Sequence, residues 1–337
     1  MEVLADGYDA ALFDLDGVVY LGPVAVEGAP EGIRDLRERG TRVGFVTNNA
    51  ARPPAAVAEH LTELGIAADA ADVVTSAQAG AQLVAQRFPA GSAVLAVGGP
   101  GVWEALDEVG LVGVASADDS PVAVLQGFGF DLTWQQLNEA AIAIHRGAHW
   151  VATNIDPTRP TERGIVPGNG AAVDAVRQAV PVDPEVAGKP YRPLVDATVD
   201  RLGAAHPIFV GDRLDTDIAG AVTAGLDSML VLTGAHGAAD LVLADPGSRP
   251  THLGYDLRDL LEPARAVDQR PGEVRCGQQT AQLDSGRIVL TSTPDDRSSA
   301  VDAAWAAATL AWQAADHGRP ADAASAVAVI NAVLARR

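Results

Sequence analysis

The sequence predicts an α/β fold in which helices cover both faces of a doubly wound parallel sheet. Short β-like runs alternate with amphipathic helical stretches, which is the pattern of such sheets. Glycine and proline residues mark most of the boundaries between them. Hydrophobic residues make up 48% of the 337 residues and charged residues 20%, which suits buried cores and argues against disorder. The length favours two or three domains.

The first block of elements starts near the N-terminus. A strand over residues 10–15 leads to a helix near 30–39, which Gly40 closes, and then to a strand over 42–46. The pair Pro53-Pro54 opens the next helix and Gly65 ends it, since proline favours the first helical turn and glycine the position just past the end.

A second block of the same kind lies about 160 residues later. It comprises a strand over 207–210, a helix near 215–224 that Gly225 caps, and a strand over 228–232. Between the two blocks lies another α/β pattern, which we interpret as an inserted domain. Its strands fall near 93–97, 122–126 and 150–153, and its helices near 101–108, 134–146 and 170–179.

The predicted domains are therefore a discontinuous core over 1–77 and 187–265, an inserted α/β domain over 78–186 and a small α+β extension over 268–337. The extension reads as short strands at 272–276, 278–283 and 287–292, with Gly286 at a turn, followed by Ala-rich helices over 298–317 and 320–336. Arg336 and Arg337 suit the negative end of the last helix.

Composition narrows the classes of partner. Acidic residues outnumber basic ones by 44 to 24, for a net charge of −20, which disfavours nucleic acid and anionic membranes. Cys276 is the only cysteine, so no internal disulfide and no cysteine metal site can form. No apolar run approaches the ~20 residues of a membrane span, and the opening residues lack the features of a signal peptide. We expect a cytoplasmic protein, and the sequence is compatible with a homodimer.

Two aspartates close the first predicted strand, in Ala10-Ala-Leu-Phe-Asp14-Leu-Asp16-Gly17. Side chains at i and i+2 of an extended segment point to the same face, so we expect Asp14 and Asp16 to lie side by side. Gly17 allows a sharp turn after them. Neighbouring carboxylates repel each other unless a cation lies between them or they divide the roles of nucleophile and proton carrier. Taken alone, the pair is also compatible with a strand that ends in an acidic turn.

Polar residues follow the next strand as well. Thr47-Asn48-Asn49 offers a hydroxyl, amides and backbone N–H groups that can hold phosphate oxygens. In open parallel sheets, ligands bind beyond the carboxyl ends of the strands, where the strand order reverses. We therefore expect these residues to line the same edge of the sheet as the two aspartates, although a polar turn would also explain the triplet.

The later strand adds more carboxylates and a lysine. Asp212 follows strand 207–210, and Asp215 and Asp217 come shortly after it. Lys189 precedes that strand in Gly188-Lys189-Pro190, where we expect the proline to start a helix. Each feature has a simpler explanation when taken alone, namely acids at a helix N-terminus and a solvated lysine. Their order along the chain makes a common site the better interpretation.

As a set, these segments resemble the four motifs of the haloacid dehalogenase (HAD) superfamily. They are Asp14-Leu-Asp16-Gly17-Val18, Phe45-Val-Thr47-Asn48-Asn49, Gly188-Lys189-Pro190 and Val210-Gly211-Asp212-Arg-Leu-Asp215-Thr-Asp217. The insertion looks like the large C2-type α/β cap of the class IIA phosphatases. The resemblance covers about residues 8–262. The extension looks like the acetyltransferase fragment of some actinobacterial relatives, without a visible acetyl-coenzyme A motif, so packing, dimerisation and regulation stay open as its role.

The resemblance implies a phosphoric monoester hydrolase. Asp14 would attack phosphorus and become an aspartyl phosphate. Asp16 would protonate the leaving oxygen and later take a proton from water. Thr47 and Lys189 would hold the transferring phosphoryl oxygens, and Asn48 and Asn49 would bind substrate beside them.

The resemblance also implies Mg²⁺ as cofactor. Its protein ligands would be Asp14, the backbone carbonyl of Asp16 and Asp212, with Asp217 close by, since Mg²⁺ prefers oxygen ligands. The dehalogenating relatives lack the second aspartate of the first motif. Asp16 therefore favours phosphoryl chemistry.

The cap is expected to select the substrate. Asn154, Asp156 and Arg163, in a segment that also holds Glu162 and Pro167-Gly168-Asn169-Gly170, look like the specificity loop of the family. An ordinary polar connection is the simpler explanation of so many turn formers. Within the family the chain most resembles actinobacterial glycerol 3-phosphate phosphatases. Pyridoxal phosphate, nitrophenyl phosphate, a sugar phosphate and phosphoglycolate are the alternative substrates.

Two other classes of protein share some of these features. A receiver-type phospho-signalling module also gathers acids, a threonine and a lysine, but it has no use for Asp16 or for a cap. A dinucleotide-dependent oxidoreductase is suggested by the glycines of residues 97–101, but Glu104 stands where its motif needs a third glycine.

Overall fold

The structure is a computed structural model that describes residues 2–161 and 163–335. The chain divides into two compact units, Met1–Val43 with Ala205–Arg337 and Gly44–Ala204. This division falls inside one strand, β4 (Arg42–Thr47). It does not coincide with the predicted domain boundaries, and these boundaries stay a prediction. Glu162, Arg336 and Arg337, named above, lie outside the described residues.

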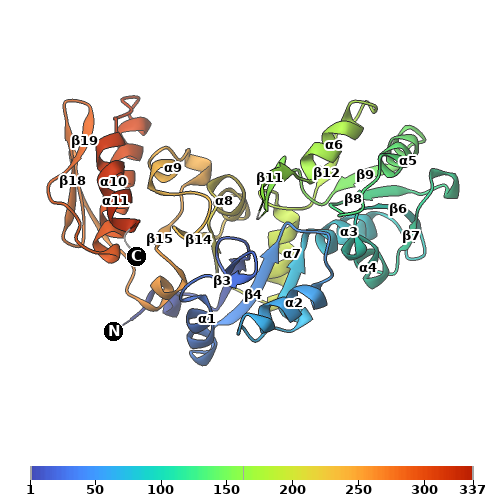
Figure 1. Cartoon of the computed structure of the whole chain (residues 1–337), viewed down its shortest axis with the longest axis horizontal. Helices are drawn as coiled ribbons and strands as arrows, with labels where there is room; N and C mark the ends of the chain where they lie inside the picture. Colours follow the sequence, from blue (N-terminus) through green and yellow to red (C-terminus); the bar gives the residue numbers. More distant parts are fainter. Residues whose placement is uncertain (1, 162, 336–337) are drawn as a thin grey trace. The chain divides into compact units, whose positions relative to one another are not determined.

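The first unit contains a parallel sheet in the order β15-β14-β13-β1, and β4 begins beside β1. Strands β14 and β15 lie side by side (Figure 1). All five residues of β1 are buried, as expected of a strand covered on both faces. Before the extension, the complete strands of this unit are β1 (Ala10–Asp14), β2 (Tyr20–Leu21), β3 (Val24–Ala25), β13 (Pro207–Gly211), β14 (Asp227–Val231) and β15 (His252–Gly254), of which β2 and β3 form a separate antiparallel pair. Its helices before the extension are η1 (Leu4–Gly7), α1 (Ala29–Glu38), η4 (Leu214–Ile218), α8 (Ala219–Ala224), α9 (Ala238–Val242), η5 (Pro246–Ser248) and η6 (Leu257–Leu261).

The predicted helix near 215–224 consists of two parts. A π-helical turn, η4, runs directly into α8, which Gly225 ends with a φ of 76°. Such turns occur mostly within longer helices and often at functional sites. Here the turn carries Asp215 and Asp217.

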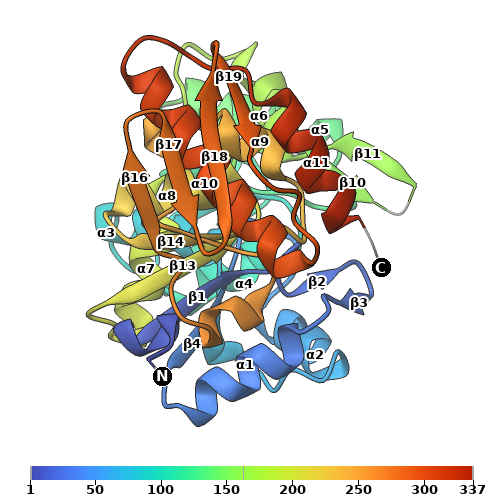
Figure 2. The same cartoon turned by 90° about the vertical axis from the view of Figure 1, so that its left-hand side faces the viewer.

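The C-terminal extension is a four-stranded antiparallel sheet, in the order β16-β17-β18-β19, with two helices on one face (Figure 2). Its elements are β16 (Val267–Arg270), β17 (Glu273–Cys276), β18 (Gln279–Asp284), β19 (Arg287–Leu290), α10 (Arg297–Asp316) and α11 (Ala324–Leu334). One hydrophobic cluster joins side chains of α10, such as Trp305, to Leu241 of α9 and Leu253 of β15. The extension therefore shares a core with the rest of this unit.

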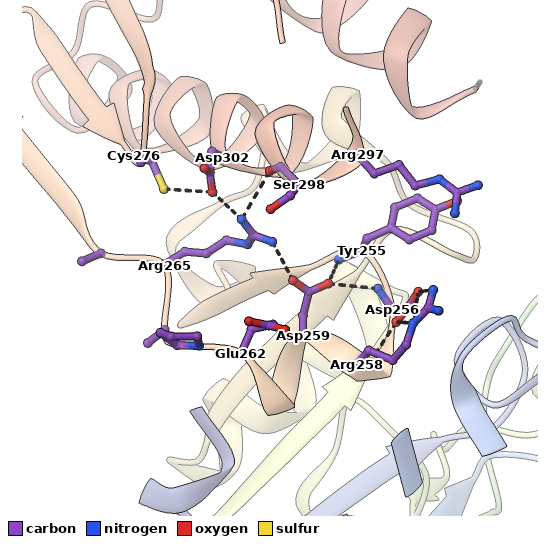
Figure 3. Close-up of a pocket in the computed structure, with 14 residues that line it drawn as sticks. Tyr255, Asp256, Arg258, Asp259, Glu262, Arg265, Cys276, Arg297, Ser298 and Asp302 are labelled. Carbon is purple, nitrogen blue, oxygen red and sulfur yellow. Dashed lines mark hydrogen bonds and ion pairs between the residues drawn. The ribbon is translucent and has the colours of Figure 1, made fainter. Parts of the chain in front are cut away.

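Arg265 links the extension to the segment before it (Figure 3). Its guanidinium is 2.6 Å from the carboxylate of Asp259 on η6 and also pairs with Asp302 on α10. The three side chains border a cavity of about 690 Å³, whose lining includes Cys276 and Arg297 but none of the predicted site residues. Burial is the main reason why the pKa of the Cys276 thiol rises to about 12.

The second unit continues β4, which pairs in parallel with β5 (Val73–Thr75). It also holds a five-stranded parallel sheet, in the order β12-β9-β8-β6-β7, which lies wholly inside the predicted cap. These strands are β6 (Ala93–Val97), β7 (Val112–Val114), β8 (Ala123–Gln126), β9 (His149–Ala152) and β12 (Glu185–Val186). The helices are α2 (Pro54–Glu63), η2 (Ala70–Asp72), α3 (Ser76–Arg87), α4 (Pro100–Glu108), η3 (Ala117–Asp119), α5 (Trp134–His145), α6 (Asn169–Arg177) and α7 (Arg192–Leu202).

Two local predictions in this unit differ from the structure. The predicted specificity loop contains an antiparallel hairpin of β10 (Thr158–Thr161) and β11 (Gly164–Pro167). The prediction that Pro190 starts a helix is wrong, because Pro190 lies in a turn and α7 begins at Arg192. Pro193 takes the place in the first helical turn that suits proline. Within residues 2–161 and 163–335, no helix has the length and apolar character needed to cross a lipid bilayer.

Candidate active site

Three of the predicted acids meet in the first unit. Oxygens from the carboxylates of Asp14, Asp212 and Asp217 all lie within 4.8 Å of one another, and the three side chains are buried. The sheet explains this placement: Phe13 is opposite Val210 in the β1–β13 pair, so Asp14 and Asp212 leave the carboxyl ends of adjacent parallel strands. The predicted convergence of these acids is thus present in the structure.

Backbone groups hold this cluster tightly. The N–H of Ala235 donates to Asp212 Oδ2 at 2.6 Å, and the N–H of Asp212 donates to Asp217 Oδ2 at 3.2 Å. A Cβ atom at Gly17 would lie 2.3 Å from Asp212 Oδ2, and one at Gly234 would lie 2.0 Å from it. Glycine is therefore needed at both positions for this carboxylate to fit.

Asp16 is placed differently from Asp14. Strand β1 ends at Asp14, and the side chain of Asp16 is exposed beyond that end and outside the cluster of three. Sequence reasoning missed the loop after β14, where the Thr233 hydroxyl donates to the Gly17 carbonyl at 2.7 Å. A Thr-Gly pair directly after the predicted strand over 228–232 was the available signal.

The donor set of the cluster fits a hard divalent cation. Burying three carboxylates together is costly unless a cation compensates their charge. Carboxylate oxygens are the ligands that Mg²⁺ and Ca²⁺ prefer, whereas zinc sites usually include nitrogen or sulfur ligands. The residues present therefore suit the predicted magnesium site.

The residues of the second motif form a polar turn in the second unit. Thr47 ends β4, and its buried Oγ1 accepts a hydrogen bond from the N–H of Asn49 at 3.0 Å. Asn49 is exposed, and its Oδ1 accepts from the N–H of Ala51 at 2.9 Å. This is the local bonding that favours asparagine in turns.

Asn48 faces Lys189 and the cap loop. Asn48 Oδ1 accepts from the N–H of Lys189 at 2.9 Å, and Nδ2 donates to the carbonyl of Lys189 at 3.1 Å. The same Nδ2 donates to Asp156 Oδ2 at 3.2 Å, and Asn154 Nδ2 donates to the carbonyl of Asn48 at 2.7 Å. Lys189 is only 2% exposed. The unit thus brings together four predicted residues, Asn48, Asn154, Asp156 and Lys189.

Arg163 does not join this group. It lies exposed at the tip of the β10–β11 hairpin. Arg159, on β10, was passed over by sequence reasoning, yet its guanidinium carbon is 4.6 Å from the ring centre of Phe128 and 5.3 Å from that of Phe130. No local sequence pattern signals a contact between segments that are 29 or more residues apart.

The chain matches two family models of known hydrolases. Residues 11–112 match the haloacid dehalogenase-like hydrolases, and residues 186–260 match the related HAD-hydrolase-like family. A D-glycerol 3-phosphate phosphatase from Mycobacterium tuberculosis is 47% identical over 274 residues, which cover 81% of this chain and 77% of the relative. The chain belongs to the haloacid dehalogenase-like hydrolases.

Other relatives of this hydrolase agree. An acid sugar phosphatase from Staphylococcus aureus is 35% identical over 257 residues, covering 76% of this chain and 96% of the relative. A crystal structure of a glycerol phosphate phosphatase from Mycobacterium tuberculosis in complex with magnesium is 42% identical, covers 99% of both chains and has a TM-score of 0.86. The C-terminal extension of this chain therefore has a counterpart in the mycobacterial structure. The chain is therefore a hydrolase, and neither a receiver-type signalling module nor a dinucleotide-dependent oxidoreductase.

Proposed function

We propose that this protein is a magnesium-dependent phosphatase that hydrolyses glycerol 3-phosphate to glycerol and phosphate. The observation that carries the proposal is the buried acidic cluster of Asp14, Asp212 and Asp217, found in a hydrolase with high identity to a D-glycerol 3-phosphate phosphatase. The Staphylococcus aureus relative makes another small sugar phosphate the second candidate substrate.

Asp14 is the proposed nucleophile. One of its oxygens forms a bond to phosphorus while the bond from phosphorus to the glycerol oxygen breaks, and Asp16 gives its proton to that oxygen. Asp16 then takes a proton from a water molecule, which attacks phosphorus, releases phosphate and restores the carboxylate of Asp14. The exposure of Asp16 supports this role, because a proton carrier must exchange protons with solvent.

Mg²⁺, when bound, supplies the positive charge that offsets the carboxylates and the phosphoryl oxygens. Asp14, the backbone carbonyl of Asp16 and Asp212 would hold it, with Asp217 supporting them. Thr47 and Lys189 are proposed to hold the phosphoryl oxygens, and Asn49 to bind beside them. The burial of Thr47 and Lys189 supports this assignment, since charged groups act most strongly where water is excluded.

The test is phosphate release from a panel of phosphomonoesters by the intact chain with Mg²⁺. The panel contains glycerol 3-phosphate, pyridoxal phosphate, 4-nitrophenyl phosphate, hexose phosphates and phosphoglycolate. We expect the highest kcat/KM for glycerol 3-phosphate and no release by Asp14→Asn. A higher kcat/KM for another ester would make that ester the substrate in place of glycerol 3-phosphate. Phosphate release from none of the esters would overturn the proposed phosphatase activity. The intact chain is required because removing the extension would expose Leu241 and Leu253.

Substrate selection is proposed to lie in the cap. Arg163→Ala should change the ranking of substrates more than it changes hydrolysis of 4-nitrophenyl phosphate, because Arg163 lies exposed on the cap hairpin and outside the hydrogen-bonded group of Asn48 and Lys189. Asn154 and Asp156 are the other proposed specificity residues. An unchanged ranking in Arg163→Ala would move selectivity to them or to Arg159.

The remaining sequence predictions are parts of this proposal. A homodimer would appear in light scattering at twice the chain mass of 34.6 kDa. A cytoplasmic location would appear in cell fractionation.

A further inference from the structure

We propose that Asn48 is a positioning residue, whose side chain fixes the backbone of Lys189 and ties it to the cap loop 154–156. The inference rests on the proposed function, because that function gives Lys189 its contact with the phosphoryl group. It assigns Asn48 an indirect role in place of direct substrate binding.

The side-chain amide of Asn48 uses its hydrogen-bonding groups on Lys189 and Asp156. Its Oδ1 accepts from the N–H of Lys189 at 2.9 Å, and its Nδ2 donates both to the carbonyl of Lys189 at 3.1 Å and to Asp156 at 3.2 Å. A backbone N–H can only donate and a carbonyl can only accept, so the orientation of the amide is determined by its partners. Both amide hydrogens are used within the chain, and none is left to donate to a phosphate oxygen.

Asn48 is itself held firmly. Its carbonyl accepts from Asn154 Nδ2 and from Ser76 Oγ, each at 2.7 Å. Ser76 begins α3 and is fully buried, and Asn154 is nearly so. The clamp on Lys189 therefore starts from a residue that α3 and the cap loop both anchor.

Gly188 shows how closely the segments approach. A Cβ atom at this position would lie 2.6 Å from Asn48 Oδ1 and 2.5 Å from the carbonyl of Thr153. Only glycine allows Lys189 to reach the amide of Asn48 along this path.

Lys189 needs such support because no regular element fixes it. It lies in a turn that ends before α7 begins at Arg192, and Asn48 is 141 residues away in the sequence. A displacement of about 1 Å in a group that contacts reacting atoms can cost about 100-fold in rate. Loss of the clamp should therefore lower kcat more than it raises KM.

A double-mutant cycle tests whether Asn48 acts through Lys189. We expect Asn48→Ala to lower kcat about 10- to 100-fold and Lys189→Ala to lower it further. In the double variant the Asn48 change should add less than about threefold, because the residue it positions is gone. Effects that multiply in full, or a rise in KM with kcat unchanged, would overturn the inference. If Asn48→Ala does not fold, Asn48→Asp replaces it in the cycle, since it keeps the shape and loses both donated bonds.

Amide exchange gives a readout that needs no activity. The Lys189 N–H should be protected in the wild-type chain and exchange at least about tenfold faster in Asn48→Ala, because its acceptor is removed. Ser76→Ala is the matched control: it removes a hydrogen bond to the same residue and leaves the clamp, so protection of Lys189 should persist. Equal protection in wild type and Asn48→Ala would overturn the clamp. Lack of phosphatase activity in the wild type would instead overturn the proposed function, and the exchange result would stand.

Discussion

Replacing Asp212 with Asn tests whether the acidic cluster is a cation site. The carboxylate oxygens of Asp14, Asp212 and Asp217 lie within 4.8 Å of one another. At this separation two unit charges repel by about 3.5 kcal/mol at an effective dielectric constant of about 20. An asparagine amide oxygen can still accept the N–H of Ala235, so the substitution removes one charge and two repulsive pairs while keeping the shape.

Backbone N–H groups already offset part of this repulsion. We therefore expect Asp212→Asn to stabilise the metal-free protein by about 1–3 kcal/mol, and each kcal/mol raises Tm by about 2–4 °C in a unit of this size. Magnesium should reverse the order, because the wild type gains about 4.1 kcal/mol at a concentration about 1,000 times Kd and the variant lacks a ligand. Thermal unfolding in chelator and in a MgCl₂ series measures both effects.

Asp215→Asn is the matched control. Asp215 lies three residues away from Asp212, is exposed, and pairs with Arg213 at 2.7 Å. This variant should melt like the wild type in chelator and respond normally to magnesium. The reasoning fails if Asp212→Asn melts below the wild type in chelator and shows an undiminished magnesium shift.

Three further predictions concern Asp14, Arg265 and His252. Asp14→Asn should lower kcat by about 10⁴-fold or more without lowering Tm, and phosphate release at near wild-type rates would remove Asp14 as nucleophile. Arg265→Ala should lower the free energy of unfolding by about 3–5 kcal/mol, since it breaks a largely buried ion pair; an unchanged Tm would contradict this. Burial lowers the pKa of His252 below its ordinary value of 6.5, so folding favours the neutral ring and stability should fall as the pH drops below about 6.5. His252→Gln should flatten this decline of Tm, and an identical slope would argue against the assignment.

Much of the fold could be predicted because local chemistry sets where elements begin and end. The helix expected over 30–39 is α1 (Ala29–Glu38), and the strand expected over 207–210 is β13 (Pro207–Gly211). The acidic cluster was predictable for a related reason: strands next to each other in a parallel sheet bring their carboxyl ends together, so residues that follow such strands meet.

Features that depend on distant contacts could not be predicted in this way. Strand β16 (Val267–Arg270) contains one apolar residue and forms because it pairs with β17. The hairpin of β10 and β11 reads as a loop because Pro160, Gly164 and Pro167 interrupt its sequence. The bonds between Asn48 and Lys189 join two segments that no local pattern relates.

The position of Asn48 bears on how substrate fit could influence catalysis. Asn48 contacts Asp156 and Asn154 of the cap loop on one side and Lys189 on the other, all within one compact unit. A substrate that displaces this loop therefore also strains the bonds that place Lys189. Since Lys189 is proposed to contact the phosphoryl group during transfer, a poorly fitting alcohol should reduce kcat and not only raise KM. Selection by the cap would then act on the transition state, which is where discrimination between substrates of similar size is most effective.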